Sequence, residues 1–181
     1  MAKGGLRLKV VFSEEQIRGR VRAMAEDISR DHGNEVVHVV GILENGFIFL
    51  SDLIRLLRCP VVCHFMVMEA VESTEAGHQP RRNIAYGPIG DIAGKNILLV
   101  DALVESGITL DHLIQILLSH GPKSLRTAVL VDRQDRRRVD CRVDYAGFQW
   151  TGGRLVGYGL EKDGLYRNLP HVAELPAEAS K

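Results

Sequence analysis

The stretch that most constrains the fold of this chain is residues 97–110, ILLVDALVESGITL. Its first four residues are all apolar with no polar alternation, which is typical of a strand buried on both faces in a parallel sheet. Asp101 follows directly, Glu105 comes four residues later, and a short turn, 106–109, leads into the periodic apolar pattern of a helix. Backbone N–H groups of such a turn converge on a phosphate, and its serine and threonine hydroxyls add donors without charge. The sequence therefore predicts a strand-turn-helix site for an anion.

The same alternation of strand and helix occurs along much of the chain. Apolar runs at 36–40, 61–68 and 125–131 predict strands, the first of them buried, and the apolar spacing of 47–57 predicts a helix. This order predicts an α/β fold with a mainly parallel central sheet flanked by helices. Ligands of such folds bind beyond the carboxyl ends of the strands, where three loops should converge: those after Val40, Val100 and Val131.

The start of the chain carries a clear helix signal. Residues 8–12 resemble a short strand, and Ser13 with Gln16 forms the Ser-x-x-Gln capping box that begins a helix. Two further short strands are expected at 143–145 and 155–159. At this length we expect one domain, residues 1–181, with an ample core and a frayed tail at 176–181.

Two polar segments follow predicted strands. Residues 69–82 are polar and aperiodic, so they form either a mobile active-site loop, which we favour, or an exposed connection between edge strands. Residues 132–138, DRQDRRR, contain a charge run, and we expect Arg136 to Arg138 to lie in solvent. Arg133, closest to the strand end, is the better functional candidate.

Composition excludes several classes of function. The 23 basic residues balance the 23 acidic residues, which gives no support to binding of nucleic acid or a membrane surface. No apolar stretch approaches a membrane span, so we expect a cytoplasmic protein with small-molecule partners. The three cysteines form no CxxC pair, which argues against a disulfide framework and a zinc site. His38, inside a predicted strand, is expected to be structural, and Trp150 to be a packing residue.

The sequence also narrows the class of ligand. It has neither the Gly-x-Gly-x-x-Gly pattern of dinucleotide sites nor a Walker-type loop. In a site for a sugar phosphate with vicinal hydroxyls, an acid at the strand end would bind either the hydroxyls or a divalent cation. The turn beside that acid would bind the phosphate. Asp101, Glu105 and the 106–109 turn offer that arrangement in one segment.

Residues 97–110 resemble the phosphoribosyl-pyrophosphate motif of type I phosphoribosyltransferases. Further stretches are similar, in order and spacing, to the hypoxanthine(-guanine) phosphoribosyltransferases: SEEQI at 13–17, VDYAGF at 143–148, VGYGL at 156–160 and YRNLP at 166–170. The resemblance covers nearly the whole chain. It implies the type I fold, with a small hood region beside the main sheet.

The resemblance also implies a reaction and its participants. The family joins a 6-oxopurine, hypoxanthine or guanine, to phosphoribosyl pyrophosphate with Mg²⁺, giving a nucleoside monophosphate and pyrophosphate. Self-association as a homodimer or homotetramer is implied on the same ground.

Each matching position receives a role from the resemblance. Glu105 matches the carboxylate that handles the purine N7 proton, a general acid/base task. Asp101 would lie near the ribose hydroxyls and the metal, and Glu161 would bind metal. Arg133 would read the purine 6-oxo group, and Leu155 would meet the base edge through its backbone. The remaining substrate-binding positions are the 5′-phosphate turn, Ser106, Gly107, Ile108 and Thr109, and the pyrophosphate group, Leu43, Glu44, Asn45 and Arg167.

Several of these positions depart from the family pattern. Glu105 and Glu161 stand where aspartate is usual, Ala102 replaces the second acid of a pair, and Glu44 stands where a lysine is usual. In addition, Ala70 and Val71 replace a Ser-Tyr pair, and Arg133 replaces a lysine. Arg154 replaces an aromatic residue that stacks on the base, although the planar guanidinium of an arginine can also stack on a base.

These departures leave three hypotheses open. The first, which we favour, is an active 6-oxopurine phosphoribosyltransferase whose longer acids and arginines substitute for the usual residues. The second is a protein of the same fold that binds a nucleotide or phosphoribosyl compound without turnover, in a regulatory or assembly role. The third is transfer to an altered base.

Overall fold

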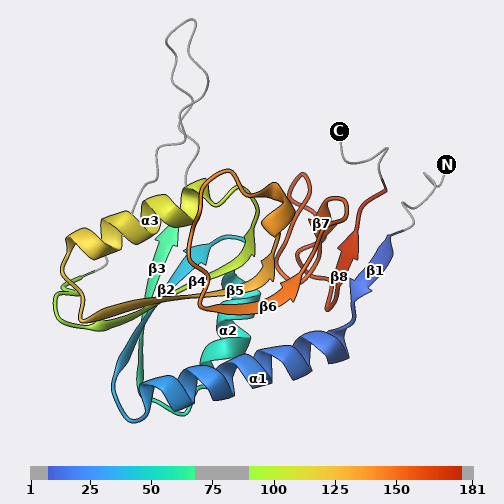
Figure 1. Cartoon of the computed structure of the whole chain (residues 1–181). Coiled ribbons are helices and arrows are strands. Elements are labelled where there is room, and N and C mark those ends of the chain that lie inside the picture. Colours follow the sequence, from blue (N-terminus) through green and yellow to red (C-terminus); the bar gives the residue numbers. More distant parts are fainter. Residues whose placement is uncertain (1–7, 68–89, 177–181) are drawn as a thin grey trace, which may run out of the picture.

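The structure is a computed structural model that describes residues 8–67 and 90–176. Its elements alternate as the sequence predicts (Figure 1). In chain order they are β1 (Lys9–Phe12), α1 (Glu14–His32), β2 (Val37–Leu43), α2 (Phe47–Ile54), β3 (Val61–Val67), β4 (Asn96–Val104), α3 (Ile108–Ser119), β5 (Ser124–Asp132), the 3₁₀ helix η1 (Gln134–Arg136), β6 (Tyr145–Gln149), β7 (Leu155–Val156) and β8 (Val172–Glu174).

The central sheet has five parallel strands in the order β3-β2-β4-β5-β6. The chain runs from β2 outward to β3 and then returns to place β4 on the other side of β2. The strand order therefore reverses between β2 and β4, which is the point where open α/β sheets bind ligands. The predicted fold class is confirmed.

Strand β4 is buried on both faces, as its unbroken apolar run predicts. Leu98, Val100 and Ala102 pack in one core cluster with residues of α1 and α2. Ile97 and Leu99 point to the other face, where they join the apolar residues of α3. Figure 1 shows this layering, with α1 and α2 below the sheet and α3 above it.

A second, antiparallel sheet in the order β1-β8-β7 lies beside the main sheet, on the right in Figure 1. It brings the N-terminal strand against the end of the chain, with Lys9 opposite Glu174. Leu155 pairs with Glu174 on the other edge of β8. This small sheet and the turns next to it occupy the place of the expected hood.

The predicted start of the first helix and the predicted packing role of Trp150 are confirmed. Ser13 Oγ accepts a hydrogen bond from Gln16 N at 3.2 Å, and Gln16 Oε1 accepts one from Ser13 N at 2.8 Å, so the capping box is complete. His38 is half-buried, and its Nδ1 lies 3.0 Å from His64 Nε2 on the neighbouring strand. Trp150 packs against the main core cluster, as expected.

Two predictions of short strands need correction. The strand expected at 143–145 occupies Tyr145–Gln149 instead, because the Asp144 carboxylate accepts a hydrogen bond from Thr127 N at 2.9 Å before the strand begins. The strand expected at 155–159 ends at Val156, because residues 157–159 all have positive φ and form a turn. The strand expected at 61–68 is confirmed as far as Val67. The 69–82 prediction, and residues 177–181 of the tail predicted at 176–181, lie outside the described residues.

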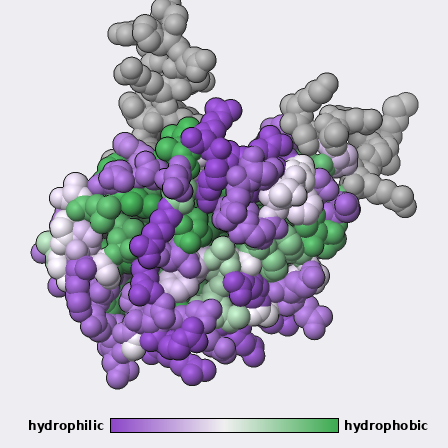
Figure 2. Space-filling model, in the orientation of Figure 1, coloured by the Kyte–Doolittle hydropathy of each residue, from purple (hydrophilic) through white to green (hydrophobic). Residues whose placement is uncertain are grey.

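Figure 2 shows that the face drawn is largely hydrophilic, with hydrophobic side chains on the left of the view, where α3 lies in Figure 1, and a further group on the right. Helix α3 carries two large exposed apolar residues, Ile108 and Leu118. No helix in the part of the chain that the structure describes is both long enough and apolar enough to cross a membrane.

Candidate active site

The predicted anion turn joins β4 to α3. Gly107 is the N-cap of α3 and has a left-handed φ of +79°, with no side chain capping the helix. The first N–H groups of an α-helix have no partner within the helix, so this uncapped end offers its donors to a ligand. The Ser106 hydroxyl lies beside the turn and accepts a 3.4 Å hydrogen bond from Ile108 N.

Gly107 is also packed tightly from behind. A Cβ atom at this position would lie 2.8 Å from Cys141 Sγ and 2.9 Å from the Val139 carbonyl oxygen. Both the backbone conformation and the space therefore require glycine here.

A cavity of about 400 Å³ opens over this turn at the strand order reversal. Most of the predicted site residues line it together, although they come from separate loops. They are Leu43, Glu44, Asn45, Asp101, Glu105, Ser106, Gly107, Thr109, Glu161 and Arg167. Ile108 does not line it, and its side chain is exposed.

A second cavity, of about 650 Å³, adjoins the first. Asn45, Leu103, Glu105 and Glu161 line both, so the two form one continuous site. Arg133, Arg154 and Leu155, which the resemblance assigns to the purine, line this second cavity. The site thus has a smaller end at the predicted phosphate turn, called the phosphate end below, and a larger end, with Glu105 at the boundary.

Glu105 and Arg133 form an ion pair across this boundary, with 2.8 Å between Glu105 Oε1 and Arg133 Nη1. The Arg133 side chain is 4% exposed, whereas that of Glu105 is 53% exposed. Carbonyl oxygens of Gly152 and Gly153 accept further hydrogen bonds from the guanidinium. Its buried Nε has no hydrogen-bond partner within the described residues.

Asp101 lies within β4, which continues to Val104, so the strand is longer than the four apolar residues before Asp101 predict. Its Oδ1 accepts a 2.7 Å hydrogen bond from Ala102 N. Burial disfavours the charged carboxylate and raises the pKa of Asp101 to about 6, although hydrogen bonds from Ala102 and Leu103 N–H act in the opposite direction. A small change in environment therefore decides whether this acid is charged near neutral pH.

Arg167 reaches the site from the hood. Its Nη2 lies 2.8 Å from Glu44 Oε2, and its Nη1 donates to Asn45 Oδ1 at 2.6 Å and to the Gly159 carbonyl at 2.7 Å. The structure brings the predicted pyrophosphate residues together. In doing so it gives Glu44 a cationic partner.

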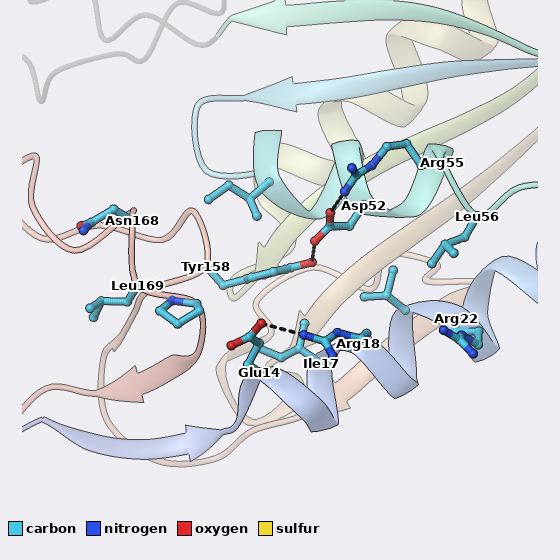
Figure 3. Close-up of a pocket in the computed structure, with 13 residues that line it drawn as sticks. Glu14, Ile17, Arg18, Arg22, Asp52, Arg55, Leu56, Tyr158, Asn168 and Leu169 are labelled. Atoms are coloured by element: carbon cyan, nitrogen blue, oxygen red, sulfur yellow. Dashed lines mark hydrogen bonds and ion pairs between the residues drawn. The ribbon is translucent and has the colours of Figure 1, made fainter.

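A separate pocket of about 560 Å³ lies between α1, α2 and the hood turn (Figure 3), and none of the predicted site residues lines it. There the Tyr158 hydroxyl donates to Asp52 at 2.7 Å, and Asp52 also pairs with Arg55. Burial and this contact hold the pKa of Tyr158 well above its usual range. The contact ties the hood to α2, the helix that directly follows Leu43, Glu44 and Asn45.

One ion pair near the site, Asp132 with Arg137, was not predicted from the sequence, and Arg137 was expected elsewhere. Asp132, at the end of β5, is 2% exposed and pairs with Arg137. Arg137 was expected in solvent, but its side chain is only 16% exposed, because the buried Asp132 carboxylate draws it inward. The position of Asp132 beside Arg133 at a strand end was the one available signal.

The parallel sheet, the helix turn at Gly107 with Glu105 directly after β4, and the adjoining larger cavity are the arrangement that the sequence predicts for a protein that binds a sugar phosphate beside a second reactant. Residues 11–162 match the family described as phosphoribosyl transferase domain. The chain belongs to this family, in the branch of the hypoxanthine(-guanine) phosphoribosyltransferases.

Named relatives support that branch. The chain is 38% identical to hypoxanthine-guanine phosphoribosyltransferase of Aquifex aeolicus, over 93% of this chain and 94% of the relative. It is 34% identical to the enzyme of that name from Dictyostelium discoideum, over 96% and 98%. A crystal structure of hypoxanthine-guanine phosphoribosyltransferase from Bacillus anthracis, with a HEPES molecule in the active site, superposes with a TM-score of 0.83 at 34% identity, covering 95% of this chain and 99% of that chain.

Proposed function

We propose that this protein transfers the phosphoribosyl group of phosphoribosyl pyrophosphate to a 6-oxopurine, hypoxanthine or guanine, and releases pyrophosphate. The observation that carries the proposal is the position of Glu105, which lies where the phosphate cavity meets the larger cavity and is paired there with Arg133. A carboxylate at that boundary can reach a base held next to the ribose.

The proposed chemistry assigns a task to the residues at each end of the site. The N–H groups of the 106–109 turn bind the 5′-phosphate, and Arg167 binds the pyrophosphate. Arg133 donates to the 6-oxo oxygen, while Glu105 accepts the proton from purine N7. The bond from C1′ to the pyrophosphate oxygen breaks as the bond from N9 to C1′ forms, so the leaving group departs with its electron pair.

The residues present fit a magnesium ion in part. Asp101 and Glu161 both line the phosphate cavity, but no three His, Cys, Asp or Glu residues in the described ranges lie close enough together to hold a metal ion. Mg²⁺ is often bound through one or two carboxylates and completed by substrate phosphates and water. We propose that Asp101 and Glu161 would hold it together with the substrate, where it would neutralise the charge of the pyrophosphate.

The named relatives favour transfer over binding alone, and one assay decides between them. Purified protein is incubated with phosphoribosyl pyrophosphate, Mg²⁺ and hypoxanthine, guanine, xanthine or adenine, and pyrophosphate release is followed beside calorimetric binding. We expect release with hypoxanthine or guanine. Binding without release for every base would reject the enzyme, and release with adenine alone would indicate an altered base.

The buried acid Asp101, within β4, predicts a pH dependence. Because the pKa of Asp101 is about 6, its ionised fraction falls below that pH, and kcat/KM for phosphoribosyl pyrophosphate should fall about tenfold per pH unit there. The raised pKa also means that ionisation costs stability, so this residue contributes most to stability below the unfolded pKa and loses that contribution as pH rises through 6. Asp101→Asn should therefore melt higher than wild type at pH 8, and the difference should shrink toward pH 4. An unchanged acidic limb in Asp101→Asn would assign the limb to another group.

The Glu44 contact predicts an effect on substrate affinity. Glu44→Gln removes a negative charge from the pyrophosphate end and frees Arg167, so KM for phosphoribosyl pyrophosphate should fall. The Glu44 side chain is 72% exposed, so the change should be about two- to fivefold, and it should shrink at high salt. Glu35→Gln is the matched control, since Glu35 makes a comparable exposed pair with Lys123 far from the site. A higher KM in Glu44→Gln would show that Glu44 assists binding.

We propose that the protein self-associates and that it is cytoplasmic. A structural neighbour from Trypanosoma cruzi is described through the role of its C-terminal region on the oligomeric state and enzymatic activity. We propose a homodimer or homotetramer for this chain as well, to be measured by sedimentation at the concentrations of the assay.

A further inference from the structure

The segment after β5 contains a buried ion pair that the proposed reaction does not use. Arg137 Nη2 lies 2.5 Å from Asp132 Oδ1, with side chains 16% and 3% exposed. Asp132 Oδ2 accepts further hydrogen bonds from Gln134 at 3.2 Å and Gln149 at 3.5 Å. Asp132 of β5 thus holds the guanidinium, and Gln134 of η1 and Gln149 of β6 in turn hold the Asp132 carboxylate.

That place is directly behind the phosphate turn. A Cβ atom on Gly107 would lie 3.2 Å from Arg137 Nη1, so the guanidinium contacts the N-cap of α3. This Nη1 is buried and has no hydrogen-bond partner among the described residues. An unpaired buried donor costs free energy, so packing against the turn has to offset that cost.

The backbone of the two residues that follow Arg137 also holds the turn. Arg138 N and Val139 N both donate to the Ser106 carbonyl, at 2.9 and 3.2 Å. Val139 O and Cys141 Sγ complete the wall behind Gly107. The Asp132–Arg137 pair therefore anchors the segment that fixes the turn from behind.

We propose that Arg137 is a positioning residue for the phosphate-binding turn. The inference rests on the proposed function for the identity of the bound phosphate. Arg137 acts through the backbone of residues 106–107, and Asp132 neutralises most of its charge, so its effect is on geometry rather than on attraction of the anion. Loss of Arg137 should weaken phosphate binding while leaving the purine end of the site intact.

A cavity of about 560 Å³ adjoins the pair, because both Asp132 and Arg137 line it. It is lined by polar side chains, among them Asp132, Gln134 and Arg137. A guanidinium ion could enter it and replace a missing Arg137 side chain beside Asp132. This access provides a rescue that a general loss of stability would not show.

The test uses Arg137→Ala and Arg137→Lys, with Arg138→Ala as control because the Arg138 side chain is exposed and its backbone N–H is kept. KM for phosphoribosyl pyrophosphate should rise about tenfold or more in Arg137→Ala, since a misplacement near 1 Å can cost a hundredfold. KM for hypoxanthine should stay within about twofold. Guanidinium chloride at low, non-denaturing concentration should lower the raised KM, whereas sodium chloride should not.

Arg137→Ala leaves Asp132 buried and unpaired, which can prevent folding. Arg137→Lys keeps a charge for Asp132 and should fold, with a smaller rise in the same KM. An unchanged KM with kcat reduced in proportion to the folded fraction would overturn the inference. If wild-type protein shows no turnover, the proposed function fails, and calorimetric Kd values for phosphoribosyl pyrophosphate and a nucleoside 5′-monophosphate still decide the inference: weaker binding in Arg137→Lys supports it and equal binding overturns it.

Discussion

Glu105→Gln is expected to lower kcat by about 10²- to 10⁴-fold, the usual contribution of a positioned general base. The amide oxygen of glutamine can still accept the hydrogen bond from Arg133 Nη1, so the pairing seen at 2.8 Å keeps an acceptor. The amide cannot take the N7 proton at neutral pH. KM for phosphoribosyl pyrophosphate should therefore change little, and pyrophosphate release in steady state is the measurement.

Two further variants sharpen this expectation. Glu105→Asp keeps a base but shortens it by one methylene, so it should retain more activity than Glu105→Gln. Glu14→Gln removes a glutamate that pairs with Arg18 on α1, at the pocket of Figure 3, and should leave kcat unchanged. Full activity in Glu105→Gln would mean that another group accepts the proton and that the assignment of Glu105 is wrong.

Gly107→Ala should abolish most phosphate binding and raise KM for phosphoribosyl pyrophosphate more than tenfold. The left-handed φ of +79° strains any other residue, at a cost of about 1–3 kcal/mol. The added methyl group would also meet Cys141 Sγ and the Val139 carbonyl oxygen at less than 3 Å, so the turn has to shift. Affinity for a nucleoside 5′-monophosphate, measured by calorimetry, reports that shift directly.

The same helix supplies a matched control at its other end. Gly121, just beyond the C-terminus of α3, has a comparable φ of +65° but nothing within 4 Å of an added Cβ. Gly121→Ala should therefore lower the melting temperature through strain without altering phosphate affinity. Equal losses of affinity in the two variants would show that the effect at Gly107 comes from instability of α3 alone.

Parts of the fold and of the site could be predicted because their signals are local in the sequence. The burial of β4, the turn at 106–109 and the capping box of α1 each depend on residues within a few positions of one another. Backbone geometry and hydrogen bonding act at that range, so residue type and spacing are sufficient. The longer polar loops could not be assigned in this way, since they lack any repeating pattern.

Other parts required the fold. The three arginines at 136–138 look alike in the sequence, yet Arg137 alone is drawn in by Asp132, whereas the side chain of Arg136 is 60% exposed. Likewise Glu44 gains a partner 123 residues away, and the pKa of Asp101 rises to about 6 only because the strand is covered on both faces.

By itself, the sequence determined the α/β class, the phosphate turn and the resemblance to a family, because these follow from local periodicity and short motifs. Only the tertiary structure decided which charges meet. It paired Glu105 with Arg133 across 28 residues and placed Arg137 behind Gly107. Ion pairing and desolvation depend on distances between elements that are far apart in the chain, and those distances exist only once the sheet and its loops have assembled.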